Sequence, residues 1–252
     1  MLREPHSLYE VAILKRFYGT SLIPNISPSE WKKLFQLITY LLARRYDTSK
    51  PVIIKPSDGC NNLIADLLVA NPQNCGLFIY SKIQRFLVSV LKYEDRHEWA
   101  RIRLRELTID RQKQDLAVKF DPRHLNNWQT AVLVWIYHME TYGRICQTPC
   151  GKKLLALDSE VLLDRPVPAL CAILRHFGYQ PNSDVIEQTL KRPEFNTHSK
   201  DPGQSYDEDT REREYKKNSL QMQNEIQAGL GWAQEIMQTG HPQAVPPNQL
   251  LI

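Results

Sequence analysis

The sequence lacks a long apolar run, and this absence bounds the class of protein. No apolar stretch among the 252 residues approaches the roughly 20 that a membrane-spanning helix needs. The N-terminal stretch MLREPHSLYEVAILKRF carries Arg3 and Glu4 close to its start and has no uninterrupted apolar core, so it does not form a secretory signal. We therefore expect a cytoplasmic protein without a membrane partner.

The sequence also lacks a strong excess of one charge, and it has few cysteines. The net charge of +4 is too weak to argue for nucleic acid, and no cluster combines basic residues with stacking aromatics. Five cysteines are an odd number, which favours reduced thiols in a cytosolic setting. Cys146 and Cys150 form a C-x3-C pair, but no second pair or histidine cluster lies nearby in the sequence. Because a structural zinc needs four ligands, we expect no metal site.

Glycine is scarce where nucleotide-binding proteins need it. The ten glycines are scattered, and none stands in a G-x-x-x-x-G-K-[ST] pattern. Such loops hold phosphates with backbone N–H groups at the start of a helix. The absence of a Walker lysine and of a magnesium-binding pair disfavours a nucleotide kinase.

What remains is the composition of a soluble globular protein. Apolar residues make up 42% of the chain and charged residues 24%. We expect one α/β domain over residues 1–238, because no internal repeat or strong boundary interrupts it. Residues 239–252 contain three prolines and are expected to form a disordered tail.

Residues 51–91 form the most informative stretch and predict a strand–helix–strand–helix order. Residues 52–55 and 76–80 are short apolar runs, and a helical pattern lies between them. Two such strands joined by a helix form a βαβ unit with parallel strands. Ligands bind beyond the carboxyl ends of such strands. Polar residues stand at these ends of both strands, namely Lys55, Ser57, Asp58, Ser81 and Lys82. They could equally be ordinary loop residues.

A third strand is expected at 153–157, which completes a three-layer α/β domain with a parallel sheet and helices on both faces. Amphipathic or apolar periodicity predicts helices over 8–18, 30–45, 86–115, 127–142, 162–177, 183–190 and 208–238. We interpret the arginines of 86–115 as a solvated helix face. His138, within the apolar 127–142 helix, is interpreted as a packed rather than a catalytic histidine.

Three stretches resemble the sulfotransferase family, a P-loop-type α/β fold with a small, mostly uncharacterised bacterial branch. They are VIIKPSDGCNNLIADLL with GLFIYSKIQRFLVSVLK, then LLALDSEVLLDRPVPALCAILRHFGY, and finally FNTHSKD with YDEDTRERE. Together they cover residues 50–235, and the second is the most specific. The resemblance implies sulfuryl transfer from the donor 3′-phosphoadenosine 5′-phosphosulfate to an unknown small-molecule or peptide acceptor.

The resemblance assigns catalytic roles to two residues of the first stretch. Lys55 would stabilise charge on the bridging oxygen of the donor. The family continues Lys-Thr-His, whereas this chain has Lys55-Pro56-Ser57. A serine hydroxyl is too weakly basic to deprotonate the acceptor, so Asp58 would act as base.

The donor's 3′-phosphate would be held by Ser81, Ser89 and Lys200. The family places an arginine and a serine eight positions apart, and here Ser81 stands at the arginine position. A hydroxyl supplies neither charge nor a bidentate fork, so Lys82 or Arg85 would have to compensate.

The glycine-rich loop of the family is missing, and its place would lie before Met1. We therefore expect a sheet without its first strand, and an exposed apolar edge that promotes self-association. Two hypotheses follow: a sulfotransferase that is inactive as written, and a non-catalytic binding or interaction protein on a degenerate sulfotransferase scaffold.

Overall fold

The computed structural model describes residues 2–44, 51–192, 208–238, 246 and 248–250. Its α-helices are α1 (His6–Phe17), α2 (Pro28–Leu42), α3 (Ile64–Ala70), α4 (Ile83–Leu91), α5 (Glu94–Gln112), α6 (Asn127–Cys146), α7 (Ser159–Asp164), α8 (Pro166–His176), α9 (Ser183–Leu190), α10 (Glu208–Gln221) and α11 (Gln223–Gln238). The strands are β1 (Leu2–Arg3), β2 (Ile54–Lys55), β3 (Gly76–Tyr80) and β4 (Leu154–Asp158), and short 3₁₀ helices are η1 (Asp58–Leu63), η2 (Pro122–His124) and η3 (Pro149–Lys153). The described chain is a helix-rich α/β protein with parallel strand pairs.

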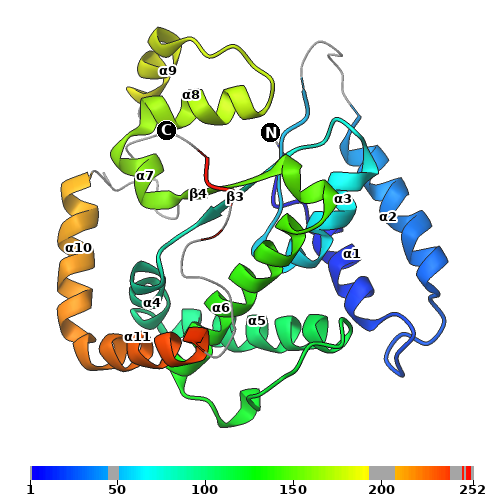
Figure 1. Cartoon of the computed structure of the whole chain (residues 1–252), viewed down its shortest axis with the longest axis horizontal. Helices are drawn as coiled ribbons and strands as arrows, with labels where there is room; N and C mark the ends of the chain where they lie inside the picture. The colour runs from blue at the N-terminus through cyan, green and yellow to red at the C-terminus, as the bar shows by residue number, and fades with distance from the viewer. Residues whose placement is uncertain (1, 45–50, 193–207, 239–245, 247, 251–252) are drawn as a thin grey trace.

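Helix α6 forms the centre of the core. Asn126 caps its N-terminus: the Asn126 side chain accepts a hydrogen bond from the backbone N–H of Gln129. The Gln129 side chain in turn accepts from the backbone N–H of Asn126. The helix is apolar around most of its circumference, so it needs partners on several sides. Helices α4, α5 and α11 supply them, and Figure 1 shows α6 crossing the middle of the molecule.

A second, smaller core joins α1 and α2. Ser27 and Glu30 form a capping box at the start of α2, and Pro28 occupies its first turn. The rings of Trp31 and Phe35 stack with centroids 5.4 Å apart. The indole Nε1 of Trp31 donates to the carbonyl of Val11 at 3.0 Å, which ties α2 to α1. The outer face of α2 remains apolar and exposed at Leu37, Tyr40 and Leu41.

Two of the predicted strands lie in one parallel sheet, as expected. Strands β3 and β4 are parallel, with Gly76 opposite Leu154 and Tyr80 opposite Asp158. The prediction 76–80 matches the bounds of β3, and the strand predicted at 153–157 is observed one residue later, at 154–158. The carboxyl ends of both strands therefore lie at one edge, as parallel pairing requires.

The prediction of one sheet containing all three strands is wrong. Strand β2 is hydrogen-bonded to β1, with Ile54 opposite Leu2 and Lys55 opposite Arg3, and it is not a neighbour of β3. Pro56 lacks the N–H that would continue the ladder, so β2 ends after two residues. A strand this short leaves few backbone groups for a second partner.

Three of the predicted helices are each divided in two. The expected helix 86–115 is α4 and α5, 162–177 is α7 and α8, and 208–238 is α10 and α11. Pro166 sits in the first turn of α8, where its missing N–H is not needed. Helices α10 and α11 run in clearly different directions (Figure 1). Periodicity identified the buried faces but not these turns.

The end of the chain adds to the strand pair. Ala156 of β4 donates its N–H to the carbonyl of Asn248 at 2.9 Å and accepts from the N–H of Leu250 at 2.8 Å. Gln249 is thereby bridged in parallel to Ala156. Most of 239–252, where a disordered tail was expected, lies outside the described residues, so that expectation stays a prediction.

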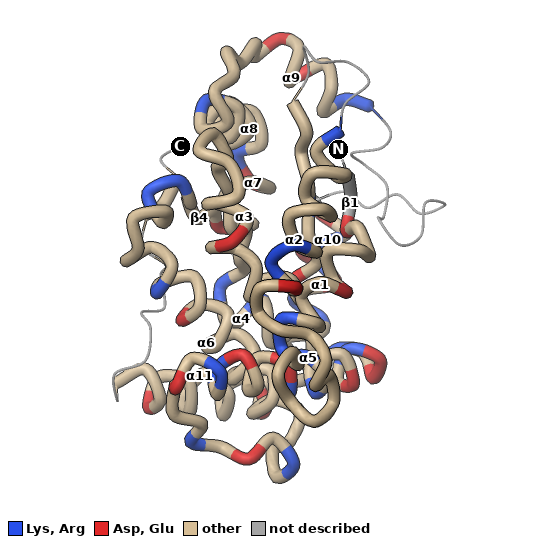
Figure 2. The backbone as a smooth tube through the Cα atoms, turned by 90° about the vertical axis from the view of Figure 1, so that its right-hand side faces the viewer, with Lys and Arg blue, Asp and Glu red and all other residues tan. Residues whose placement is uncertain are grey.

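Charged residues of both signs are interspersed along the helices (Figure 2). The expected solvated face of 86–115 is correct for Arg101 and Arg105, but Arg103 and Arg111 are each only 6% exposed. Among the described residues, no helix is long and apolar enough to cross a membrane.

Candidate functional site

The carboxyl edge of β3 and β4 brings Ser81 next to Ser159. Their hydroxyl oxygens are 2.9 Å apart. The indole of Trp135 on α6 donates to the carbonyl of Ser81 at 2.8 Å, which fixes this turn against the core. Ser81 thus lies at the edge where the strand order predicted it, with its hydroxyl already engaged.

The cations at this edge are paired with acidic residues. Lys82 Nζ lies 3.6 Å from a carboxylate oxygen of the buried Asp158. One guanidinium nitrogen of Arg85 lies 2.9 Å from Glu160 and 2.7 Å from Glu212. Three carboxylates therefore face two cations. Lys82 and Arg85 were expected to replace the family arginine in binding a phosphate. They can do so only if these ion pairs separate.

The other expected phosphate contacts do not join Ser81. Ser89 lies on α4 and is exposed, although its neighbours Val88 and Val90 are buried. Lys200 lies outside the described residues. Of the three residues expected to hold the 3′-phosphate, only Ser81 lies at the strand edge, and its hydroxyl is already hydrogen-bonded to Ser159.

Lys55 is the last residue of β2 and forms an ion pair with Glu4. Its Nζ lies 2.6 Å from Glu4 Oε1, with both side chains about half exposed. Glu4 has a left-handed φ of 48°, and its N–H donates to the Lys55 carbonyl at 2.6 Å. A non-glycine residue in this conformation is uncommon and costs on the order of 1 kcal/mol or more. The turn holds the Glu4 carboxylate next to Lys55 Nζ, the amine that was expected to stabilise the donor.

Asp58 is held by Arg103 of α5. The guanidinium Nε lies 2.8 Å from Asp58 Oδ2, and Nη2 donates to Oδ1 at 3.3 Å. The second neighbour is His138 of α6, whose Nε2 lies 4.0 Å from Oδ2. The expected base therefore has both oxygens next to cationic or donor groups.

The side chain of His138 is 12% exposed, and the ring does more than fill space. The amide of Asn61 lies 2.8 Å from His138 Nδ1. With the amide nitrogen as donor, this contact assigns the proton of the neutral ring to Nε2, which faces Asp58. Burial is the main cause that lowers the pKa of His138 to about 4; Asp58 opposes this shift, and the charges on Arg103 and Arg16 contribute to it.

Asp58 belongs to a cluster of charged residues that extends into the protein. We call this cluster the buried ion network, and its members are Arg16, Asp58, Arg103, Glu106 and Asp110. Arg16 is 1% exposed and donates from Nε to Asp110 at 3.0 Å and from Nη2 to the Gly59 carbonyl at 2.7 Å. Arg103 forms a close ion pair with Glu106. The network connects α1, η1 and α5.

Arg16 and the acidic partners of this network were not predicted from the sequence. One signal was present: Arg16 follows Leu8 and Ala12 at four-residue spacing on the buried stripe of α1. Arg103 and Glu106 have the i, i+3 spacing of a helical ion pair. Neither pattern by itself distinguishes a buried pair from a surface pair.

We expect acid to destabilise the protein through His138. Its folded pKa lies below the ordinary value of about 6.5, so the unfolded chain binds a proton that the folded chain does not. Stability is therefore fully present above about pH 6.5 and is lost as the pH falls toward 4, by up to about 3 kcal/mol. Urea unfolding between pH 7 and 4.5 measures this loss.

The matched variants are His138→Gln and His6→Gln. His6 is an exposed histidine on α1, its side chain 82% exposed. His138→Gln should flatten the pH dependence between pH 6.5 and 4.5, and His6→Gln should leave it unchanged. An unchanged slope in His138→Gln would show that other groups cause the acid sensitivity.

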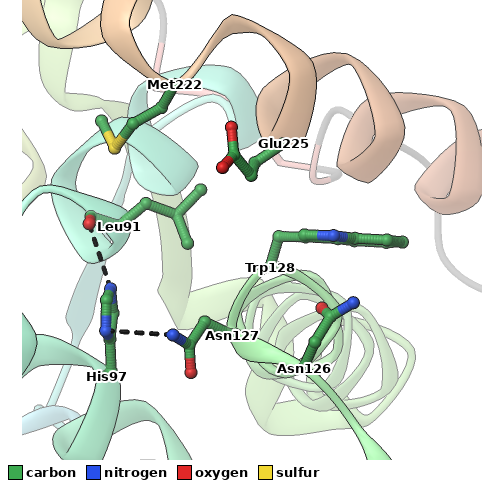
Figure 3. A pocket seen from close by; sticks show the side chains of 7 residues that line it. All are labelled: Leu91, His97, Asn126, Asn127, Trp128, Met222 and Glu225. Carbon is green, nitrogen blue, oxygen red and sulfur yellow. Dashed lines mark hydrogen bonds between the residues drawn. The ribbon is translucent and has the colours of Figure 1, made fainter.

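A small pocket of about 300 Å³ lies where α6 begins, near the α10–α11 junction. His97 and Asn127 line it together with Trp128 and Glu225 (Figure 3). The two ring nitrogens of His97 lie 3.0 Å from the Leu91 carbonyl and 3.1 Å from the Asn127 amide. Because both nitrogens are engaged, this histidine positions helices and is not free for acid–base chemistry.

Comparisons with family models, curated proteins and solved structures give no match to this chain. The functional conclusions below therefore rest on its residues and their geometry.

Proposed function

We propose that this chain is a sulfotransferase-like protein that acts by binding a ligand and does not transfer a sulfuryl group by itself. One observation carries the proposal: the two expected catalytic side chains are each paired with an opposite charge. Lys55 Nζ lies 2.6 Å from Glu4 Oε1, and Asp58 Oδ2 lies 2.8 Å from Arg103 Nε. Because these contacts hold the two groups in separate ion pairs, Lys55 is not free to act on a donor and Asp58 is not free to act on an acceptor.

The strand edge supports the same proposal. A donor phosphate needs charged partners, and hydrogen bonds to charged groups contribute about 1.5–3 kcal/mol each. Here Ser81 bonds Ser159, while Lys82 and Arg85 neutralise carboxylates. Binding 3′-phosphoadenosine 5′-phosphosulfate would require breaking those ion pairs first.

The enzyme hypothesis is the second candidate, and the parallel β3–β4 pair favours it. Ser81 lies at the carboxyl edge of that pair, where ligands of α/β sheets bind. In this case Lys55 would leave Glu4 to stabilise the bridging oxygen, and Asp58 would deprotonate an acceptor hydroxyl or amine. Positioning and electrostatic stabilisation would supply most of the rate, as in phosphoryl transfer.

Titration with 3′-phosphoadenosine 5′-phosphate distinguishes the two candidates. We expect no binding by the chain at micromolar concentrations in isothermal titration calorimetry, and no labelled sulfate transferred from 3′-phosphoadenosine 5′-phosphosulfate to test acceptors. The matched variants are Ser81→Ala and Ser21→Ala, because Ser21 is exposed and lies outside the predicted site. Micromolar binding that Ser81→Ala weakens and Ser21→Ala leaves intact would favour the enzyme. Self-association stays a prediction that light scattering can check on the same samples.

A further inference from the structure

We propose that a second pocket, beside the buried ion network, binds a small phosphate or sulfate monoester that carries a hydroxyl group. The basic pocket, as we call it, has a volume of about 640 Å³. Its lining comes from α1, η1, α3, α5, α6 and the turn after α6, and the charged groups in it are Lys15, Asp110, Lys113 and Arg144. The volume lies in the range of small-molecule sites. The inference deepens the proposed binding function and uses none of the residues expected from the sulfotransferase resemblance.

The charges of the basic pocket are not balanced. Lys15 is paired with Asp66 at 2.5 Å, and Asp110 with Arg16 at 2.9 Å. Lys113 and Arg144 make no ion pair with a carboxylate in the part of the chain that the structure describes. Two positive charges thus remain, which a phosphate monoester with two negative charges would neutralise and a sulfate monoester with one would neutralise in part.

Arg144 provides the strongest sign of a ligand. It lies in the last turn of α6, and its Nη1 is buried without a hydrogen-bond partner among the described residues. An unpaired buried donor costs free energy, more so when it is charged. A guanidinium also presents parallel N–H groups that match two oxygens of a phosphate or sulfate.

Lys113 is held in place toward the same pocket. Its Nζ donates to the carbonyls of Lys15 and Tyr18 at 2.9 and 3.0 Å, and it lies 3.8 Å from the centre of the Tyr18 ring. Burial lowers the pKa of Lys113, and the charge on Lys15 adds to this effect, while Asp110 opposes it. An anion in the pocket would relieve the repulsion between the two lysines.

Asn62 indicates that the ligand carries a donor as well. Its amide nitrogen donates to the Ala12 carbonyl and to Asp110, both at 3.1 Å, so its orientation is set by two acceptors. Its Oδ1 is buried and has no donor among the described residues. A hydroxyl group on the ligand would fill this gap, which inorganic sulfate, an anion without an O–H group, cannot do.

The test is calorimetric titration with glycerol 3-phosphate, with glycerol 3-sulfate, with inorganic sulfate and with glycerol. We expect at least one of the two esters to bind with a sub-millimolar Kd, inorganic sulfate to bind more weakly, and glycerol not to bind. The two ester arms distinguish phosphate from sulfate as the preferred group. Failure of both esters to bind at millimolar concentration would overturn the inference.

Variants locate the binding. Arg144→Gln and Lys113→Gln should each weaken ester binding by about tenfold or more, because each removes a charge-assisted contact. Lys32→Gln, an exposed cation of α2, is the matched control and should bind as the unchanged chain does. Far-ultraviolet circular dichroism verifies folding, and Lys113→Gln serves alone if Arg144→Gln does not fold. Equal binding by a folded Arg144→Gln or Lys113→Gln protein would place the ligand elsewhere.

The outcome is separable from that of the proposed function. Ester binding lost in Arg144→Gln but kept in Ser81→Ala supports the basic pocket, whatever the strand edge does. Nucleotide binding lost only in Ser81→Ala would refute the proposed function and leave the basic pocket to be judged by its own titration.

Discussion

Replacing Arg16 with methionine is expected to lower the free energy of unfolding by about 3–5 kcal/mol. Arg16 is 1% exposed and its partners are Asp110 and the carbonyl of Gly59. Removing the cation leaves Asp110 buried without its charge partner. Burial already raises the pKa of Asp110, and Arg16 opposes that rise. The carboxylate therefore becomes costly once the guanidinium is gone.

Urea unfolding of Arg16→Met measures this loss, and Lys33→Met is the matched control. Lys33 is an exposed cation on α2, so its replacement should change stability by no more than about 0.5 kcal/mol. Adding Asp110→Asn to Arg16→Met should recover part of the stability, since the uncompensated charge is removed with its partner. A loss below about 1 kcal/mol in Arg16→Met would mean that water reaches the network.

Replacing Gly151 with alanine is the second large effect that we expect, with a loss of about 3 kcal/mol. Gly151 lies in η3, packed against the end of α6. A Cβ there would stand 2.2 Å from the carbonyl oxygen of Ile145 and 2.5 Å from the Cα of Cys146. Both neighbours are backbone atoms of α6, so no side chain can rotate away, and η3 has to shift.

Gly143→Ala is the control for this prediction, and it should have the opposite sign. Gly143 lies in α6 itself, and a Cβ there would meet no atom within 4 Å. Alanine is the better helix former, so this change should stabilise the protein by about 0.5–1 kcal/mol. Thermal and urea unfolding of both variants measure the pair. Similar small effects for the two would show that η3 does not pack closely on α6.

Local sequence determined most of the helices and two strands. The stripe containing Trp31 and Phe35 predicted α2, because apolar side chains at helical spacing need one common face. The apolar run 76–80 predicted β3 with its observed bounds, and 153–157 predicted β4 within one residue. These features depend on side chains a few residues apart, whose periodicity is visible in the sequence.

Tertiary structure decided the strand partners and the fate of the expected site. Lys55 ends β2 as predicted, but its partner Glu4 lies 51 residues earlier, brought there by the β1–β2 pairing. Asp58 is likewise met by Arg103, 45 residues later on α5. Which of these distant groups pair depends on how the helices pack, and no local pattern specifies it.

The burial of charge was also decided only by tertiary structure. Arg16 and Arg103 look like ordinary helix cations in the sequence, yet both are almost fully buried. Arg144, also a helix residue, has a buried nitrogen without a hydrogen-bond partner among the residues that the structure describes. A charged side chain is buried at tolerable cost only where the fold supplies its counter-charge, and that supply comes from helices far apart in the chain. The sequence therefore determined which segments are helices and strands, and packing determined which charges are paired, which are left over, and where a ligand can bind.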